Sequence, residues 1–142
     1  MQINKNKISK LLRKTGIFWA LIILIIILSC VSSAFFTTRN FINIFRQAAI
    51  TSILAIGMTF VLLTGGIDLS VGSVTALAGV FAAYVGVADR GMPLIVCYIV
   101  AIGTGIICGF INGIGVAYIG FPPFIMTLGM MGIARGIAQV FT

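Results

Sequence analysis

The residues of this chain that could do chemistry are few, and several of them lie in one short segment, TGGIDLSVGS at positions 64–73. Its carboxylate, Asp68, lies between two apolar runs that carry no other charge from Ala48 to Ala88. A lone acid at the centre of a bilayer is unfavourable by about 2.5–3.5 kcal/mol. We therefore expect Asp68 at a helix end, in a polar cavity, or in both.

The residues around this acid indicate how the chain accommodates it. Glycines there can adopt the positive φ that ends one helix, and Asp68 or Ser70 can accept the free N–H groups that begin the next. The segment is predicted to be a tight turn or a broken helix with a polar centre that a hydroxyl-rich solute could use. Helix capping alone is the compatible alternative. The candidate substrate-path residues are Thr64, Gly65, Gly66, Asp68, Ser70 and Ser73.

The inventory of reactive side chains argues against an enzyme. The chain has two acidic residues and no histidine, so acid–base pairs and His/Cys/Asp metal sites cannot be built from it. Its three cysteines lie in apolar runs without metal-ligand spacing. No lysine follows Lys14, which excludes a G-x-x-x-x-G-K-[ST] phosphate loop. We expect no catalytic residue, no metal site and no cofactor bound by this chain.

Composition predicts the class of protein. Of the 142 residues, 61% are hydrophobic and only 8% are charged, a balance that a soluble domain of this size cannot bury. The apolar runs are continuous and lack the alternation of barrel strands. The sequence therefore predicts an all-α membrane protein, a polytopic bundle of about four to five spans in the lipid bilayer.

Basic residues predict the orientation. Several of the nine basic residues precede the first apolar run, Ile17–Val31, so the N-terminus is expected in the cytoplasm. We interpret that run as a first spanning helix and not as a cleaved signal peptide. The net charge of +7 is explained by topology and anionic headgroups, and no nucleic-acid partner is expected. The basic residues of the tail are Lys5, Lys7, Lys10, Arg13 and Lys14.

Segment lengths and turn residues predict the organisation, given that a span needs about 20 apolar residues. The Asp89–Arg90 pair and the prolines near position 122 mark two of the breaks. All segments are expected to form one domain. In order, they are a basic tail (1–16), helix (17–36), external loop with an amphipathic lead-in (37–47), helix (48–64), Gly/Asp turn (65–70), helix (71–88), turn (89–93), helix (94–118), Gly/Pro break (119–123) and a truncated helix (124–142).

Glycines in the fourth span recur every four residues and so share one helix face: Gly105, Gly109 and Gly113. Small residues at this spacing let helices approach closely in lipid. We expect a packing seam within one bundle, with a subunit interface or a translocation surface as alternatives. Asn112, beside this stripe, can hydrogen-bond to a neighbouring helix.

Arg135 stands alone in the last apolar segment. Its long stem can carry the guanidinium to the membrane interface, which is the expected arrangement. Pairing with Asp68 across the bundle is the alternative hypothesis.

Two sequence blocks carry a family resemblance. They are ILAIGMTFVLLTGGIDLSVGSVTALAG at 53–79 and CGFINGIGVAYIGFPPFIMTLGMMGIARGIAQVFT at 108–142. In this order and at similar spacing, they resemble the permease subunits of bacterial ABC importers for ribose and related monosaccharides. The first 40 residues match that family only in general character.

This resemblance implies a transmembrane permease subunit that forms part of a monosaccharide path by alternating access. It implies three partners: an ATP-binding subunit that holds and hydrolyses the ATP, a periplasmic or extracellular sugar-binding protein, and a second permease subunit, identical or different. It also implies the inner membrane of a bacterium. Family permeases are about twice as long, so an N-terminal fragment unable to drive transport alone is expected.

Two other functions are compatible with the residues alone. A small membrane protein could serve as a structural or regulatory packing subunit, and it should tolerate Asp68→Asn. A channel is less compatible, because rings of charged pore residues are lacking.

Overall fold

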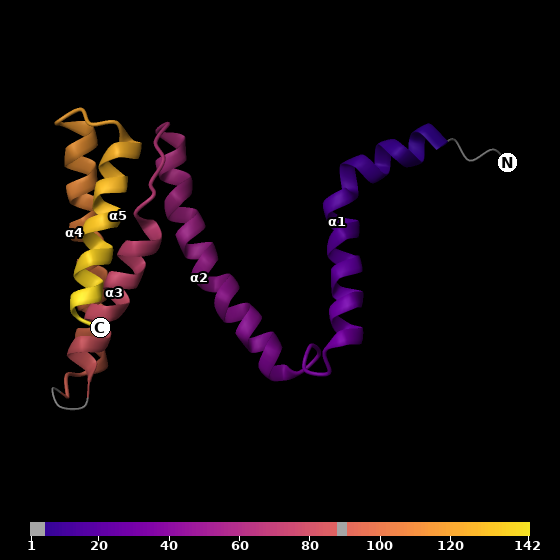
Figure 1. Ribbon diagram of the computed structural model, residues 1–142, viewed down its shortest axis with the longest axis horizontal. Helices are drawn as coiled ribbons and strands as arrows, with labels where there is room; N and C mark the ends of the chain where they lie inside the picture. Colours follow the sequence, from indigo (N-terminus) through magenta and orange to yellow (C-terminus); the bar gives the residue numbers. More distant parts are fainter. Residues whose placement is uncertain (1–4, 88–90) are drawn as a thin grey trace. The chain divides into compact units, whose positions relative to one another are not determined.

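The structure is a computed structural model that describes residues 5–87 and 91–142 (Figure 1). These residues form helices joined by turns, without a strand among them, which confirms the predicted all-α class. The predicted turn at Asp89–Arg90 lies outside the described residues. The helices are α1 (Lys5–Val31), α2 (Thr38–Leu63), α3 (Val71–Gly86), α4 (Leu94–Ala117) and α5 (Pro123–Val140).

Two helices begin ten or more residues earlier than the sequence pattern suggested. Helix α1 starts at Lys5, within the expected basic tail. Helix α2 starts at Thr38, so the expected lead-in at 37–47 forms the first turns of α2 and is not a separate segment. The cause is Thr37, whose Oγ1 accepts the backbone N–H of Asn40 at 3.3 Å and so caps the new helix end.

The chain divides into two compact units, residues 1–51 and 52–142. In the first unit, the turn after α1 is closed by the Ser32 N–H, which donates to the Leu28 carbonyl at 3.0 Å. Asn40 Nδ2 donates to the Phe35 carbonyl at 2.8 Å and fixes the start of α2. Large apolar side chains on both helices are exposed, as expected of surfaces that meet lipid or other helices.

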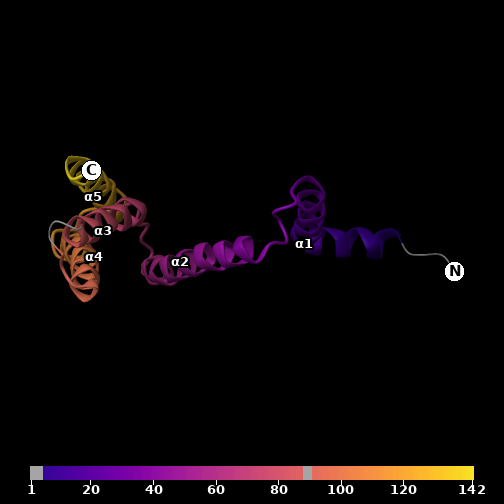
Figure 2. The ribbon, with the colours of Figure 1, turned by 90° about the horizontal axis from the view of Figure 1, so that it is seen from below.

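In the second unit, α3 packs against both α4 and α5, and α4 also contacts α5. Figures 1 and 2 show these three helices side by side in both views. Their core is small, and the two alanines that α5 contributes to it let the helix backbones come close. The core residues are Leu77, Cys108, Met130, Ala134 and Ala138, with Val74, Val80 and Phe81 packed against them.

Helix α2 ends in a glycine motif. The Gly66 N–H donates to the Val61 carbonyl at 3.1 Å and the Gly65 N–H donates to the Leu62 carbonyl at 3.0 Å, the paired bonds of a Schellman motif. Gly65 has the positive φ of 76° that this motif requires. Gly66, which the sequence also suggested for this role, is not among the glycines with positive φ.

Helix lengths fall into two groups. Helices α2, α4 and α5 are long and apolar enough to cross a membrane, whereas the Thr15–Val31 part of α1 and the whole of α3 are shorter apolar helices. At 1.5 Å per residue, the 16 residues of α3 extend about 24 Å and the 24 residues of α4 about 36 Å. The irregular segment 64–70 precedes the shorter helix and positions the site described next.

Candidate functional site

The Thr127 side chain of α5 holds the segment between α2 and α3 against that helix. Its Oγ1 accepts the Leu69 backbone N–H at 3.2 Å and lies 3.2 Å from the Ile67 carbonyl oxygen. The same hydroxyl is 2.8 Å from the carbonyl oxygen of Pro123 in its own helix. Thr127 is only 4% exposed, so these bonds form away from solvent. The chain between α2 and α3 is therefore fixed to the first turns of α5.

A second set of hydrogen bonds connects the segment to α4. Asp68 Oδ1 accepts the backbone N–H of Ser70 at 2.7 Å and its hydroxyl at 2.6 Å. Asn112 Nδ2 in turn donates to Ser70 Oγ at 3.0 Å. Ser70 is 1% exposed and Asn112 is 7% exposed, while Asp68 is half-buried. We call these three residues the Asp68 network.

The network performs only part of the capping that the sequence suggested. Asp68 accepts the N–H of Ser70, the residue that precedes α3, as an Asx turn does. The Ser70 side chain makes no capping hydrogen bond to α3. Its hydroxyl points its proton at Asp68 instead, which leaves the oxygen to accept from Asn112. Ser70 therefore joins two elements and does not cap the helix.

A cavity of about 260 Å³, which we call the Asp68 cavity, opens beside this network. Asp68, Asn112 and Thr127 contribute to its wall, and so does Thr64 at the end of α2. The other lining residues are Val61, Gly66, Ile67, Gly109, Gly113, Val116 and Pro123. Polar groups from three stretches of chain thus meet at one concave, mostly apolar site, the usual composition of a small-molecule pocket.

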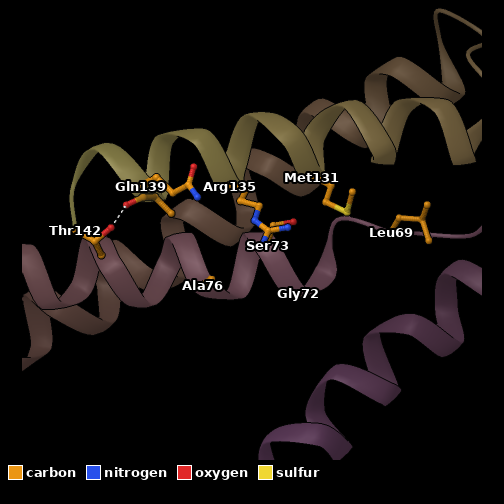
Figure 3. A pocket seen from close by; sticks show the side chains of 9 residues that line it. Leu69, Gly72, Ser73, Ala76, Met131, Arg135, Gln139 and Thr142 are labelled. Atoms are coloured by element: carbon orange, nitrogen blue, oxygen red, sulfur yellow. Dashed lines mark hydrogen bonds between the residues drawn. The ribbon is translucent and has the colours of Figure 1, made fainter.

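A separate cavity of about 470 Å³, the Arg135 cavity, lies between the start of α3 and α5 (Figure 3). The exposed Arg135 side chain extends from α5 toward Ser73 of α3. Gln139 and Thr142 lie further along the same wall, where the Thr142 hydroxyl donates to the Ala138 carbonyl at 2.9 Å. This cavity presents one cation and several hydrogen-bonding groups.

The structure divides the six candidate path residues between these places. Thr64, Gly66 and Asp68 line the Asp68 cavity. Ser73 lines the Arg135 cavity. Gly65 and Ser70 line neither cavity, since Gly65 makes the turn and Ser70 is buried in the network. These residues thus do not form a single cluster.

The suggested pairing of Arg135 with Asp68 is not formed in the described part of the chain. The two residues line different cavities, and the Arg135 side chain is directed at Ser73. Arg135 is exposed, as a snorkelling arginine would be.

The glycine stripe of α4 does not form the expected seam among the described helices. A Cβ placed on Gly105, Gly109 or Gly113 would meet no atom within 4 Å. The close approach occurs at Gly115 instead, where a Cβ would come within 2.5 Å of Met126 Sδ. Gly109 and Gly113 line the Asp68 cavity, so the stripe borders open space.

Thr127 is the site residue that sequence reasoning missed. It lies within the T-L-G motif of the second block, but the sequence gives it no role. The available signal was its position one turn after the helix start at Pro123, in a run with few other hydroxyls. Among the described residues, no group of three His, Cys, Asp or Glu side chains could hold a metal ion.

Comparison with known proteins identifies relatives along most of the chain. It is 43% identical over 136 residues to the ribose import permease protein of Haemophilus influenzae, covering 96% of this chain and 42% of that permease. It is 48% identical over 101 residues to the galactofuranose transporter permease protein of Escherichia coli, covering 71% of this chain and 29% of that protein. An autoinducer 2 import system permease protein of Yersinia pseudotuberculosis is 38% identical over 124 residues, covering 87% of this chain and 34% of that protein.

These relatives are longer, and the chain spans less than half of the length of each. No solved structure is significantly similar to the chain. Residues 40–142 match a family described as the permease component of the branched-chain amino acid transport system. That family and the apolar helices indicate a membrane-embedded transport component and not a catalytic enzyme. The chain belongs to this family of transport permeases.

Proposed function

We propose that this chain forms part of the solute path in the permease subunit of an ABC-type sugar importer. The observation that carries the proposal is the Asp68 cavity, where a carboxylate, an amide and two hydroxyls from separate elements meet. Relatives described as ribose and galactofuranose permeases support a sugar as the solute. Alternating access of the permease would expose such a path to each side of the membrane in turn.

The physics of the membrane supports this reading of the segment 64–70. Irregular backbone at membrane depth is tolerated only where protein buries it or where it lines a water-filled cavity. Transporters commonly place solute sites at such breaks between helices. Here Thr127 and Asn112 form hydrogen bonds with Leu69 and Ser70 of the irregular segment. Four of its other residues line the cavity: Thr64, Gly66, Ile67 and Asp68. A packing element alone would not require a cavity with polar groups at this point.

The proposal includes the rest of the transporter. A separate ATP-binding subunit would bind and hydrolyse ATP, so this chain would bind no cofactor. A periplasmic or extracellular sugar-binding protein would deliver the solute, and a second permease subunit, identical or different, would complete the path. The excess of basic residues before the first apolar run, Ile17–Val31, supports a cytoplasmic N-terminus in the bacterial inner membrane.

A chimera tests the function. The matched part of the Haemophilus influenzae ribose permease is replaced by this chain, and radiolabelled ribose uptake is measured in cells that lack their own ribose permease. We expect the chimera to restore uptake. Failure at normal membrane levels, with galactofuranose as well as ribose, would overturn the proposal.

Substitution of the carboxylate sharpens the test. Asp68→Asn and Asp68→Ala in the chimera should each lower uptake about tenfold or more, since a hydrogen bond to a charged group contributes roughly 1.5–3 kcal/mol. Thr75→Val is the control, because Thr75 is exposed on α3 and its hydroxyl donates to the Val71 carbonyl of the same helix at 2.7 Å. Normal uptake with Asp68→Asn would favour a structural or regulatory packing subunit instead.

A further inference from the structure

Asn112 carries a buried oxygen without a partner. The residue is 7% exposed, and its Oδ1 accepts no hydrogen bond from the described part of the chain. Leaving such a buried acceptor unpaired is unfavourable by an amount comparable to a lost hydrogen bond. Native structures usually satisfy it with ordered water or a ligand. The amide oxygen therefore marks a place where a hydrogen-bond donor is missing.

The amide cannot resolve this by turning over. The Ser70 hydroxyl has one proton, and the 2.6 Å contact with Asp68 Oδ1 uses it. Ser70 Oγ can then only accept, so it requires the NH2 end of Asn112, found at 3.0 Å. A flipped amide would place two acceptors against each other. The network thus fixes Oδ1 as the free end of the amide.

The wall beside Asn112 offers other acceptors. Asn112 lines the Asp68 cavity, whereas Ser70, its NH2 partner, does not. The Thr64 hydroxyl donates to the Val61 carbonyl at 2.7 Å, and the Thr127 hydroxyl lies 2.8 Å from the Pro123 carbonyl. Both threonine protons thus have acceptors in the backbone of their own elements. The side chains on this wall, with the carboxylate of Asp68, leave oxygen acceptors for an incoming molecule.

The size of the Asp68 cavity restricts which kind of molecule can fill it. About 260 Å³ is far above the roughly 10–15 Å³ that a single water requires. A bound metal cation needs oxygen ligands closed around it at about 2.3–2.6 Å. A wide, mostly apolar space with separate acceptors suits a neutral molecule with O–H groups better than a bare cation.

From these contacts we propose that the Asp68 cavity binds an O–H donor, with Asn112 Oδ1 and the Asp68 carboxylate as its acceptors. The donor is a hydroxyl of a polyhydroxylated solute or a water that occupies the same position. Binding of a solute hydroxyl rests on the proposed function, whereas binding of a water molecule does not. Asn112 is then a binding residue and not only a helix-packing residue.

The test uses this whole chain in lipid bilayers with 13C,15N-labelled asparagine and aspartate. Solid-state NMR measures polarisation transfer from water protons to the side-chain carbonyl carbons of Asn112 and Asp68, with and without ribose. The Asn112 signal is assigned by its loss in Asn112→Leu. Because the readout needs no transport, failed uptake by the chimera would count against the function and leave this site standing.

Each outcome decides one part of the inference. If ribose lowers the polarisation transfer from water and also shifts the Asn112 carbonyl signal, the donor is a hydroxyl of the solute. Transfer that ribose leaves unchanged supports water as the occupant. Absence of both water transfer and a ribose-induced shift overturns the proposal. A shift caused by sodium in place of choline, and not by ribose, overturns it in favour of a cation.

Variants separate binding from folding. Asn112→Leu keeps the size of the side chain and should abolish the ribose-induced shift at Asp68. Thr104→Val is the matched control: Thr104 is 9% exposed on the same face of α4, and its hydroxyl bonds to the Val100 carbonyl at 2.8 Å. If Asn112→Leu does not fold, the Asp68 signal of the unmodified chain still decides the test. An unchanged Asp68 response in folded Asn112→Leu would remove Asn112 from the site.

Discussion

Asn112 of α4 donates a buried hydrogen bond to Ser70, which lies 42 positions earlier in the chain and immediately before α3. Ser70 passes its own proton to Asp68 at 2.6 Å. One hydroxyl therefore connects a half-buried carboxylate to a buried amide. The position of Asp68 relative to α4 depends on this serine, which lines neither cavity.

Ser70→Ala should destabilise the second unit by about 1–3 kcal/mol, because it leaves the Asn112 NH2 group buried without an acceptor. Unfolding in detergent, followed by circular dichroism, measures this change. Ser73→Ala is the control, since the half-buried Ser73 hydroxyl only returns to the Ser70 carbonyl at 3.2 Å. Equal stability of the two variants would contradict a structural role for the Ser70 hydroxyl.

Thr127→Val should release the segment before α3 from α5. The variant keeps the shape of the side chain but removes the acceptor of the Leu69 N–H, so hydrogen exchange at Leu69 should accelerate. Thr127→Ser retains the hydroxyl and should restore slow exchange. Thr59→Val, at an exposed hydroxyl bonded to the Ala55 carbonyl within α2, should leave Leu69 unaffected. Unchanged exchange in Thr127→Val would show that other contacts hold the segment.

Gly65→Ala should destabilise the end of α2 by about 1–2 kcal/mol, because an L side chain at a φ of 76° is strained. Gly57→Ala within the same helix should have the opposite effect and stabilise it by about 0.5–1 kcal/mol. A Cβ on Gly57 meets no atom within 4 Å, so only backbone entropy and helix propensity change there. Thermal unfolding of both variants checks the predicted difference in sign.

Gly115→Ala and Gly113→Ala compare two glycines on α4. The new Cβ at position 115 would overlap Met126, which must move, whereas position 113 has open space. We expect lower thermal stability for Gly115→Ala and no loss for Gly113→Ala. The double variant Gly115→Ala/Met126→Ala should lose less stability than the sum of the losses in the two single variants. A double-mutant cycle measures this difference. Additive losses would contradict direct contact.

Local signals in the sequence predicted much of the fold. Continuous apolar runs predicted helices, and the glycines after Leu63 predicted the end of α2, with Gly65 adopting the positive φ. The cap formed by Thr37 is also local, but the amphipathic pattern after it suggested a separate lead-in. The start of α2 is set by the hydrogen bond from the Asn40 N–H to Thr37 Oγ1 and not by the beginning of the apolar run.

The glycine stripe shows why the packing could not be predicted in the same way. Its spacing places the three glycines on one face of α4 but does not say which neighbour that face meets. The buried residues of α4 include Thr104, Cys108 and Asn112, each one position before a glycine of the stripe. One position is a rotation of about 100° around a helix of 3.6 residues per turn, enough to leave the stripe glycines beside open space and out of close contact with a neighbouring helix. The two cavities likewise depend on tertiary packing that no spacing encodes.

The 16 residues of α3 have a consequence for biosynthesis. A lone helix needs about 20 apolar residues to settle across a bilayer, so α3 depends on a companion when the chain leaves the ribosome. Helix α4 follows after a short connection and packs against it. The two helices are therefore expected to enter the membrane as one hairpin. Their joint entry brings Asn112 of α4 and Ser70, which precedes α3, to the same depth in the membrane before α5 is synthesised.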